Sequence, residues 1–136
     1  MRIVLDTNVI VSALLSPHGP PARILDWTLS GELILLLDDR LFDEYRKVLA
    51  RAKFGFDAGD LRLLLTALDG LAERVTALPL SLVLPDRDDL PFLEVASSGR
   101  ADALITGNGR HFRPVRGRCD IDILAPAELL EVVGRR

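Results

Sequence analysis

Acidic side chains follow the short apolar runs of this sequence. Asp6 comes directly after the apolar residues 2–5, and two further acids follow the apolar residues 33–37. Carboxylates that converge without counter-charge repel one another and raise one another's pKa, so a bound cation would stabilise such a group. Oxygen ligands without a thiolate or an ordered His pair favour Mg²⁺ or Mn²⁺, which can activate water for hydrolysis of a phosphodiester. The acidic candidates are Asp6, Asp38, Asp39, Glu44, Asp86, Asp88 and Asp89.

Strands and helices alternate along the chain and would carry these acids to one edge. Because ligands bind beyond the carboxyl ends of parallel strands, the polar residues that follow each strand, including those at residues 106–108, should meet there. The pattern predicts a three-layer α/β/α sandwich around a mostly parallel sheet. Core strands are expected at residues 2–5, 33–37, 101–106 and 121–124, with a short strand at 74–77 and at best an edge element at 82–84. Helices are expected at residues 7–15, 21–29, about 39–51, 61–71 and 126–133. A further helix is expected to follow the acidic run 86–89, with Pro91 in its first turn, and to end at 98–99.

Each polar candidate also has an ordinary structural explanation. The triplet at residues 6–8 could form only a strand-to-helix turn with a helix cap. We assign Asp38 to capping, and we expect either Asp86 or Asp88 to cap the next helix. Asp102 begins a strand at the opposite edge and is expected to be structural, and Glu44 alone would be a solvated helix residue. Thr106–Asn108 could be a simple turn, and His18 and His111 are interpreted as loop residues.

Length and composition bound the possible classes of protein. The 136 residues, 49% of them hydrophobic, fit one folded domain at residues 1–136 and exclude a disordered chain. A single cysteine excludes a multi-cysteine zinc site. No apolar run approaches the roughly 18 residues of a membrane span, and the N-terminus is a poor signal peptide, so we expect a soluble cytoplasmic protein.

Charge is unevenly distributed along the chain. The net charge of −3 argues at first against a nucleic-acid partner. Residues 100–118, however, contain five arginines and His111 against Asp102 alone. Basic residues around an acidic cluster suit a metal-dependent enzyme that acts on a polyanion. The simpler explanation is that these charged side chains are solvent-exposed on ordinary helices.

The combination of motifs resembles the PIN-domain family, in particular the small bacterial and archaeal PIN proteins described as toxin components of toxin–antitoxin systems. The resemblance spans nearly the whole chain. It is carried by residues 3–9 (IVLDTNV), 41–45 (LFDEY) with 48–51 (VLAR), 86–89 (DRDD) with 92–96 (FLEVA), and 101–108 (ADALITGN).

The resemblance implies a metal-dependent endoribonuclease that cleaves single-stranded RNA. Asp6, Glu44 and Asp89 match the family's first three acidic positions, and Asp88 or Asp86 would assist in holding Mg²⁺ or Mn²⁺. The fourth position is commonly Asp, but Asn108 stands here, which offers a carbonyl oxygen without charge and favours a single tightly held ion.

Further residues and partners complete this hypothesis. The resemblance places Thr7, Asn8 and Thr106 at the edges of the site, where they could orient a carboxylate or a water. Arg110, Arg113 and Arg116 would hold the flanking phosphates, with little base stacking because aromatic residues make up 5% of the chain. An antitoxin protein and a homodimer are implied partners, and the leucine excess in residues 60–71 is compatible with a dimer surface.

Two other functions compete with this one. In the first, Asn108 marks lost catalysis, and the domain binds RNA or a protein without cleavage. In the second, the chain is a phosphatase of the haloacid dehalogenase kind. That chemistry needs a second Asp two residues after the first, where this chain has Asn8, and a downstream Lys, for which only Lys47 and Lys53 are available.

Overall fold

The computed structural model describes residues 1–115 and 120–135 and shows a five-stranded parallel sheet in the order β3-β2-β1-β4-β5. The three central strands are the apolar runs of the sequence, and their residues are almost entirely buried, as expected for a sheet covered on both faces. The strands are β1 (Arg2–Leu5), β2 (Ile34–Leu37), β3 (Glu73–Arg74), β4 (Ala103–Ile105) and β5 (Asp122–Leu124).

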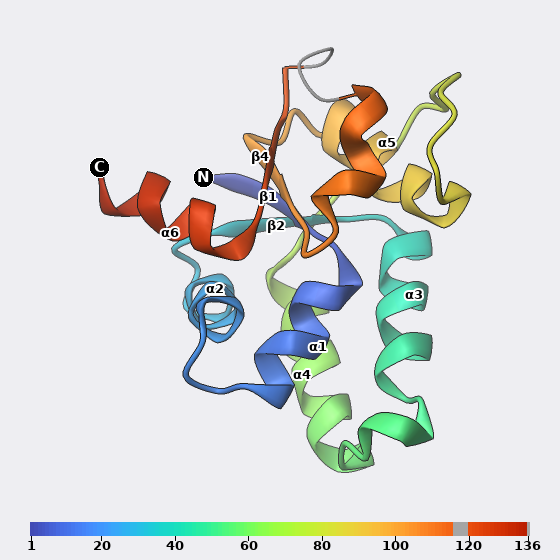
Figure 1. Ribbon diagram of the computed structural model, residues 1–136. Helices are drawn as coiled ribbons and strands as arrows, with labels where there is room; N and C mark the ends of the chain where they lie inside the picture. The colour runs from blue at the N-terminus through green and yellow to red at the C-terminus, as the bar shows by residue number, and fades with distance from the viewer. Residues whose placement is uncertain (116–119, 136) are drawn as a thin grey trace.

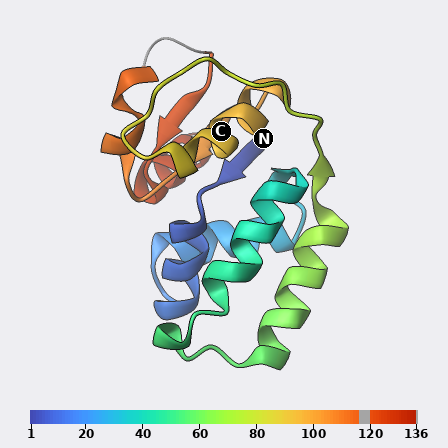
Figure 2. The same cartoon turned by 90° about the vertical axis from the view of Figure 1, so that its right-hand side faces the viewer.

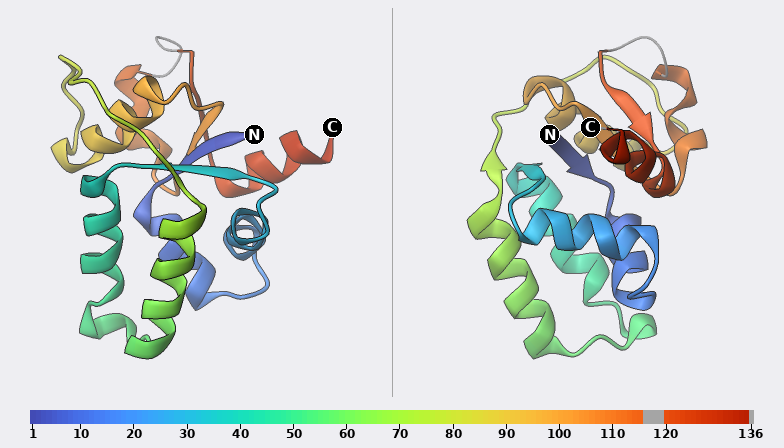
Figure 3. Two further views of the ribbon diagram at one scale, coloured as in Figure 1. Left: turned by 180° about the vertical axis from the view of Figure 1, so that it is seen from behind. Right: turned by 90° about the vertical axis from the view of Figure 1, so that its left-hand side faces the viewer.

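Helices cover both faces of this sheet (Figures 1 and 3). Helices α1 to α4 lie on one side, whereas α5 lies on the other, packed against β1, β2 and β4. This arrangement confirms the expected α/β/α sandwich. The helices are α1 (Thr7–Leu15), α2 (Pro20–Leu29), α3 (Asp39–Leu49), α4 (Ala58–Leu71), α5 (Leu90–Ser98) and α6 (Pro126–Gly134), with short 3-10 helices η1 (Ala52–Phe54), η2 (Arg87–Asp89) and η3 (Gly109–Val115).

Local signals in the sequence explain where the helices begin. Asp38 caps α3 by accepting a hydrogen bond from the Leu41 amide at 3.1 Å, which confirms its predicted role. Prolines occupy the first turns of α2, α5 and α6, where a missing amide hydrogen costs nothing. Tyr45, fully buried on α3, donates a 2.5 Å hydrogen bond to the Leu5 carbonyl and so fixes α3 against the end of β1.

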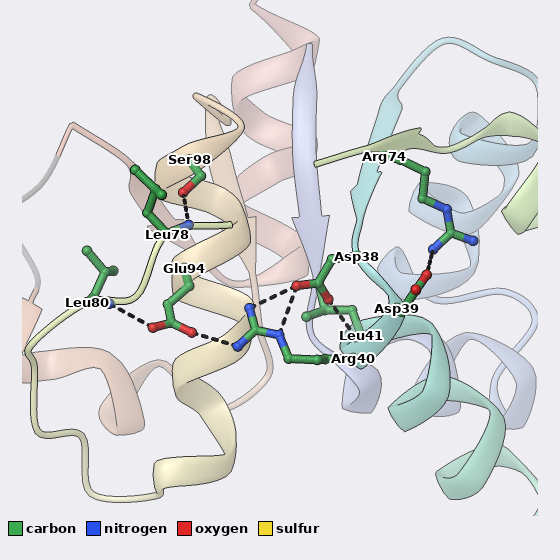
Figure 4. Close-up of polar contacts among 9 residues, drawn as sticks. All are labelled: Asp38, Asp39, Arg40, Leu41, Arg74, Leu78, Leu80, Glu94 and Ser98. Atoms are coloured by element: carbon green, nitrogen blue, oxygen red, sulfur yellow. Dashed lines mark hydrogen bonds and ion pairs between the residues drawn. The ribbon is translucent and has the colours of Figure 1, made fainter. Parts of the chain in front are cut away.

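The edge of the sheet differs in extent from the expectation. The strand expected at residues 74–77 is limited to Glu73–Arg74, and residues 82–84 form no strand. The segment after β3 leaves the sheet and runs across α5 to η2 (Figure 2). Side chains of α5 bind its amides in place of a neighbouring strand: Leu78 donates to Ser98 Oγ at 2.8 Å and Leu80 to Glu94 Oε2 at 2.7 Å (Figure 4).

Within the described ranges 1–115 and 120–135, every helix is too short or too polar to cross a bilayer.

Candidate metal centre

Asp6 stands at the carboxyl end of β1, before the first turn of α1. Its amide donates to the Ile105 carbonyl at 2.9 Å, which continues the pairing of β1 with β4. The carboxylate does not cap α1; instead Oδ2 accepts hydrogen bonds from Thr106 Oγ1 at 2.7 Å and Asn8 Nδ2 at 3.3 Å. The capping explanation therefore fails for this side chain, which faces the end of β4.

The turn after β4 interlocks with the triplet after β1. Thr106 Oγ1 accepts a hydrogen bond from the Asn108 amide at 3.0 Å while it donates to Asp6. The Gly107 amide donates to Asn8 Oδ1 at 3.0 Å. The buried Thr106 thus orients the Asp6 carboxylate, as the sequence predicts for a polar residue at the edge of the site. Thr7 Oγ1 is buried without a hydrogen-bond partner among the described residues.

A second acidic group lies at η2, where the 3-10 turn brings Asp86 and Asp89 together. Asp86 caps this turn, since its Oδ1 accepts from the Asp88 amide at 2.9 Å. The cap that was expected at the following helix therefore falls on the 3-10 turn, whereas the N-cap position of α5 is Asp89, whose side chain makes no cap hydrogen bond. Asp89 is buried, and its Oδ2 lies 3.0 Å from His111 Nδ1. One ligand atom each from Asp86, Asp89 and His111 lies within 4.8 Å of the other two.

These acids interact electrostatically across the edge. Burial, followed by the negative charges of Asp6 and Asp86, raises the pKa of Asp89 from 3.8 to about 6, although His111 opposes the effect. Burial also raises the pKa of Asp6, and the hydrogen bond from Thr106 partly offsets it. The repulsion between carboxylates inferred from the sequence is therefore present, and a divalent cation would relieve it.

Glu44 and Asp88 lie beside this cluster. Both line a hollow of about 230 Å³ between α3 and η2, together with Arg40 and Arg87. Among the described residues, neither belongs to the group formed by Asp86, Asp89 and His111, whose ligand atoms lie within 4.8 Å of one another. Glu44 is half-buried, whereas Asp88 is exposed.

Other acidic candidates have structural roles. Asp39 is exposed and forms an ion pair with Arg74 at 3.2 Å. Asp102 Oδ2 accepts a 2.8 Å hydrogen bond from the Arg2 amide at the opposite edge, as expected for a structural residue. These two carboxylates do not belong to the cluster around Asp89.

An ion-pair network joins α3, which carries Glu44, to α5, which follows Asp89 (Figure 4). Arg40, at the start of α3, forms ion pairs with Asp38 at 2.8 Å and with the buried Glu94 of α5 at 2.7 Å. Because Glu94 also accepts from the Leu80 amide, the network fixes α3, α5 and the segment that crosses α5. The network therefore supports the relative position of Glu44 and the η2 acids.

The sequence interpretation missed His111. The sequence predicts a loop residue at this position, but η3 directs its ring to Asp89, and its amide donates to the Asn108 backbone carbonyl at 3.0 Å. Phe112, the next residue, is fully buried and fixes this turn. The signal that could have identified it is its place in the sequence, three residues after Asn108 and directly before the core residue Phe112.

The predicted phosphate contacts lie on the same segment. Arg110 and Arg113 are exposed on η3. Arg116, the third predicted RNA contact, lies outside the described residues. The two exposed arginines therefore lie on the same 3-10 helix as His111.

A carboxylate cluster at the carboxyl edge of a parallel α/β sheet is the arrangement expected of a PIN domain. The PIN domain family model matches residues 2–110, and the chain belongs to this family. An uncharacterized protein of Methanocaldococcus jannaschii is 30% identical over 111 residues, which cover 79% of this chain and 71% of that protein.

A solved structure supports the fold independently. A chain in the crystal structure of VapBC2 from Rickettsia felis, bound to a DNA fragment from its promoter, superposes with a TM-score of 0.59. The match covers 92% of this chain and 98% of that chain at 13% identity. At this identity the likeness establishes the fold of the chain.

Proposed function

We propose that this protein is a divalent-metal-dependent endoribonuclease that hydrolyses phosphodiester bonds of single-stranded RNA. The observation that carries the proposal is the pair of buried carboxylates Asp6 and Asp89 at one edge of the sheet with Asp86; burial raises the pKa of both, and the negative charge of Asp6 raises the pKa of Asp89 further. Such a pair is costly in a metal-free protein and useful in a metal-bound one. Membership of the PIN family supports this interpretation.

The oxygen donors at the edge fit Mg²⁺ or Mn²⁺. Asp6, Glu44 and Asp89 would hold the ion, and Asp86, Asp88 and the side-chain oxygen of Asn108 would assist. A bound divalent ion supplies an activated water and stabilises the charge that develops on the phosphodiester.

The surrounding residues have positioning roles in this proposal. Thr106 holds the Asp6 carboxylate through its hydroxyl, and Asn8 holds both that carboxylate and the Gly107 amide. Thr7 would orient a ligand or a water through its unpaired hydroxyl. Arg110, Arg113 and Arg116 would bind the phosphates on either side of the scissile bond. Since the attacking group is water, no covalent enzyme intermediate is needed.

The direct test is cleavage of a labelled single-stranded RNA with Mn²⁺, with Mg²⁺ and with EDTA. We expect metal-dependent cleavage by the wild type and its loss in Asp6→Asn, because the amide removes a ligand charge. Asp26→Asn, at an exposed carboxylate on α2, is the matched control and should cleave as the wild type does. Full activity in Asp6→Asn would refute the site. If the folded wild type cleaves neither RNA nor DNA with either metal, the nuclease proposal is wrong.

The proposal includes a biological setting. The whole of residues 1–136 would act as one cytoplasmic domain, the toxin of a toxin–antitoxin pair, and would form a homodimer. The fold match to a chain of the VapBC2 complex supports an antitoxin partner. Co-purification with the product of an adjacent gene, followed by inhibition of cleavage by that product, tests the pairing.

The neutral Asn108 favours a second candidate, a PIN domain that binds RNA or a partner protein without cleavage. Asn108→Asp distinguishes the two candidates. The distinguishing quantity is cleavage: a disabled site, besides gaining metal affinity, should cleave only once the carboxylate is introduced, whereas a competent site should already cleave without it.

A further inference from the structure

The segment that carries Asn108 brings an imidazole to the carboxylate cluster. The Asn108 carbonyl accepts a 3.0 Å hydrogen bond from the His111 amide, so the two residues share one tight turn. The turn brings His111 Nδ1 to 3.0 Å from Asp89 Oδ2. The family match ends at residue 110, so this histidine lies just beyond the matched region.

We propose that His111 is a metal ligand that acts in place of a carboxylate at position 108, and that it makes the centre prefer Mn²⁺ and Co²⁺ over Mg²⁺. This inference rests on the proposed metal-dependent function and adds the donor set and the metal selectivity. The ligand atoms of Asp86, Asp89 and His111 lie within 4.8 Å of one another. Two donors about 2.1 Å from a common ion are separated by at most about 4.2 Å, so small side-chain movements suffice.

The carboxylates of this group are already partly ordered. Asp86 uses Oδ1 to cap η2, which leaves its second oxygen for a cation. The Asp89 side chain is 12% exposed and that of His111 29% exposed, so the group is sheltered but reachable from solvent. A metal that enters would bind the ring nitrogen in its neutral form and replace the contact between the ring and Asp89.

The donor chemistry determines the expected selectivity. Mg²⁺ requires hard oxygen ligands and binds imidazole weakly, whereas first-row transition ions accept nitrogen. Affinity for a mixed nitrogen and oxygen site rises from Mn²⁺ to Co²⁺. Exchange of a carboxylate for an imidazole therefore lowers the relative affinity for Mg²⁺ even where the geometry of the site is unchanged.

The alternative role for His111 is a hydrogen bond that only orients Asp89. In that case removal of the ring would lower the affinity for every divalent ion by a similar factor, since each ion would bind the same poorly oriented carboxylate. A ligand role makes the loss selective. The ratio of Co²⁺ affinity to Mg²⁺ affinity is thus the quantity that separates the two roles.

The test is calorimetric titration of the full chain with MnCl₂, CoCl₂ and MgCl₂. We expect His111→Asn to lower the affinity for Co²⁺ and Mn²⁺ about 10-fold or more, while the affinity for Mg²⁺ changes less than about threefold. His111→Asp should lower the Co²⁺ to Mg²⁺ affinity ratio about 10-fold by restoring a hard ligand. His18→Asn, at the exposed second histidine of the chain, is the control and should match the wild type.

A spectroscopic measurement tests coordination directly. Pulsed electron paramagnetic resonance of bound Mn²⁺ should detect a coordinated nitrogen in the wild type and in His18→Asn but not in His111→Asn. Equal weakening of all three metals, or a nitrogen signal that persists in His111→Asn, would overturn the ligand role while leaving the proposed nuclease intact. If the folded wild type binds none of the three metals, this inference and the proposed function both fail.

Discussion

Replacement of Asp89 by Asn should change the pH dependence of stability. The pKa of Asp89 is about 6 in the folded protein, against an ordinary value of 3.8. Between these values the folded state binds more protons than the unfolded state, so the free energy of unfolding of the metal-free wild type falls as pH rises. Each pKa unit corresponds to about 1.4 kcal/mol, so ionisation of Asp89 costs at most about 3 kcal/mol above pH 6.

Asp89→Asn removes this cost, since the amide has nearly the same shape and stays neutral. The variant should match the wild type near pH 4 and exceed its stability above pH 6 by at most about 3 kcal/mol, less the weakened contact with His111. Urea unfolding followed by Trp27 fluorescence in EDTA, at pH 4 to 8, measures the difference. Asp26→Asn serves as the control for loss of one surface charge.

The refuting result is a stability difference between Asp89→Asn and the wild type that stays constant across this pH range. A second expectation concerns the metal. Saturating Mn²⁺ should stabilise the wild type above pH 6, because it binds the folded state alone, and should stabilise Asp89→Asn much less. Equal stabilisation of both proteins would show that the ion binds elsewhere.

Three further changes test the scaffold by urea unfolding in EDTA. Gly99→Ala should cost about 1–3 kcal/mol, because the new Cβ would lie 2.8 Å from Leu36 Cδ1. Tyr45→Phe should cost about 1–2 kcal/mol, since it removes a fully buried hydrogen bond to a strand carbonyl. Arg40→Met should cost about 1–3 kcal/mol because it leaves the Glu94 carboxylate buried without its cation, and Glu94→Gln in the same chain should recover most of the loss.

Asp6 shows where local sequence reasoning is ambiguous. An acid between a strand and a helix suits both a cap and a ligand, and the residues next to it do not distinguish these roles. The decision comes from Thr106, 100 positions along the chain, which binds the carboxylate across the sheet edge. The rule that ligands gather beyond the carboxyl ends of parallel strands predicted this meeting, although hydrophobic periodicity alone could not.

The errors have physical causes of the same kind. Residues 75–77 and 82–84 look strand-like because most of their side chains are apolar, but the amides of Leu78 and Leu80 between them bind side chains of α5 in place of a strand. His111 was missed because its partner, Asp89, is 22 positions away and on a different element. The central strands and the starts of the helices depend on local sequence patterns and were predictable. Strand pairing at the sheet edge and contacts between side chains distant in sequence depend on tertiary structure and were not.

The neutral Asn108, at a position where the family commonly has Asp, links the stability of this centre to its proposed metal selectivity. Asp6 and Asp86 already raise the pKa of Asp89, and a further carboxylate on the same turn would add to that repulsion. Asn108 avoids the added cost, and His111 lowers the pKa of Asp89 when protonated and can donate a lone pair when neutral. Under this proposal, the chain has a lower affinity for hard cations and a higher stability without metal. Asn108→Asp should therefore move the two properties in opposite directions, with tighter Mg²⁺ binding and a metal-free protein that is less stable above pH 6.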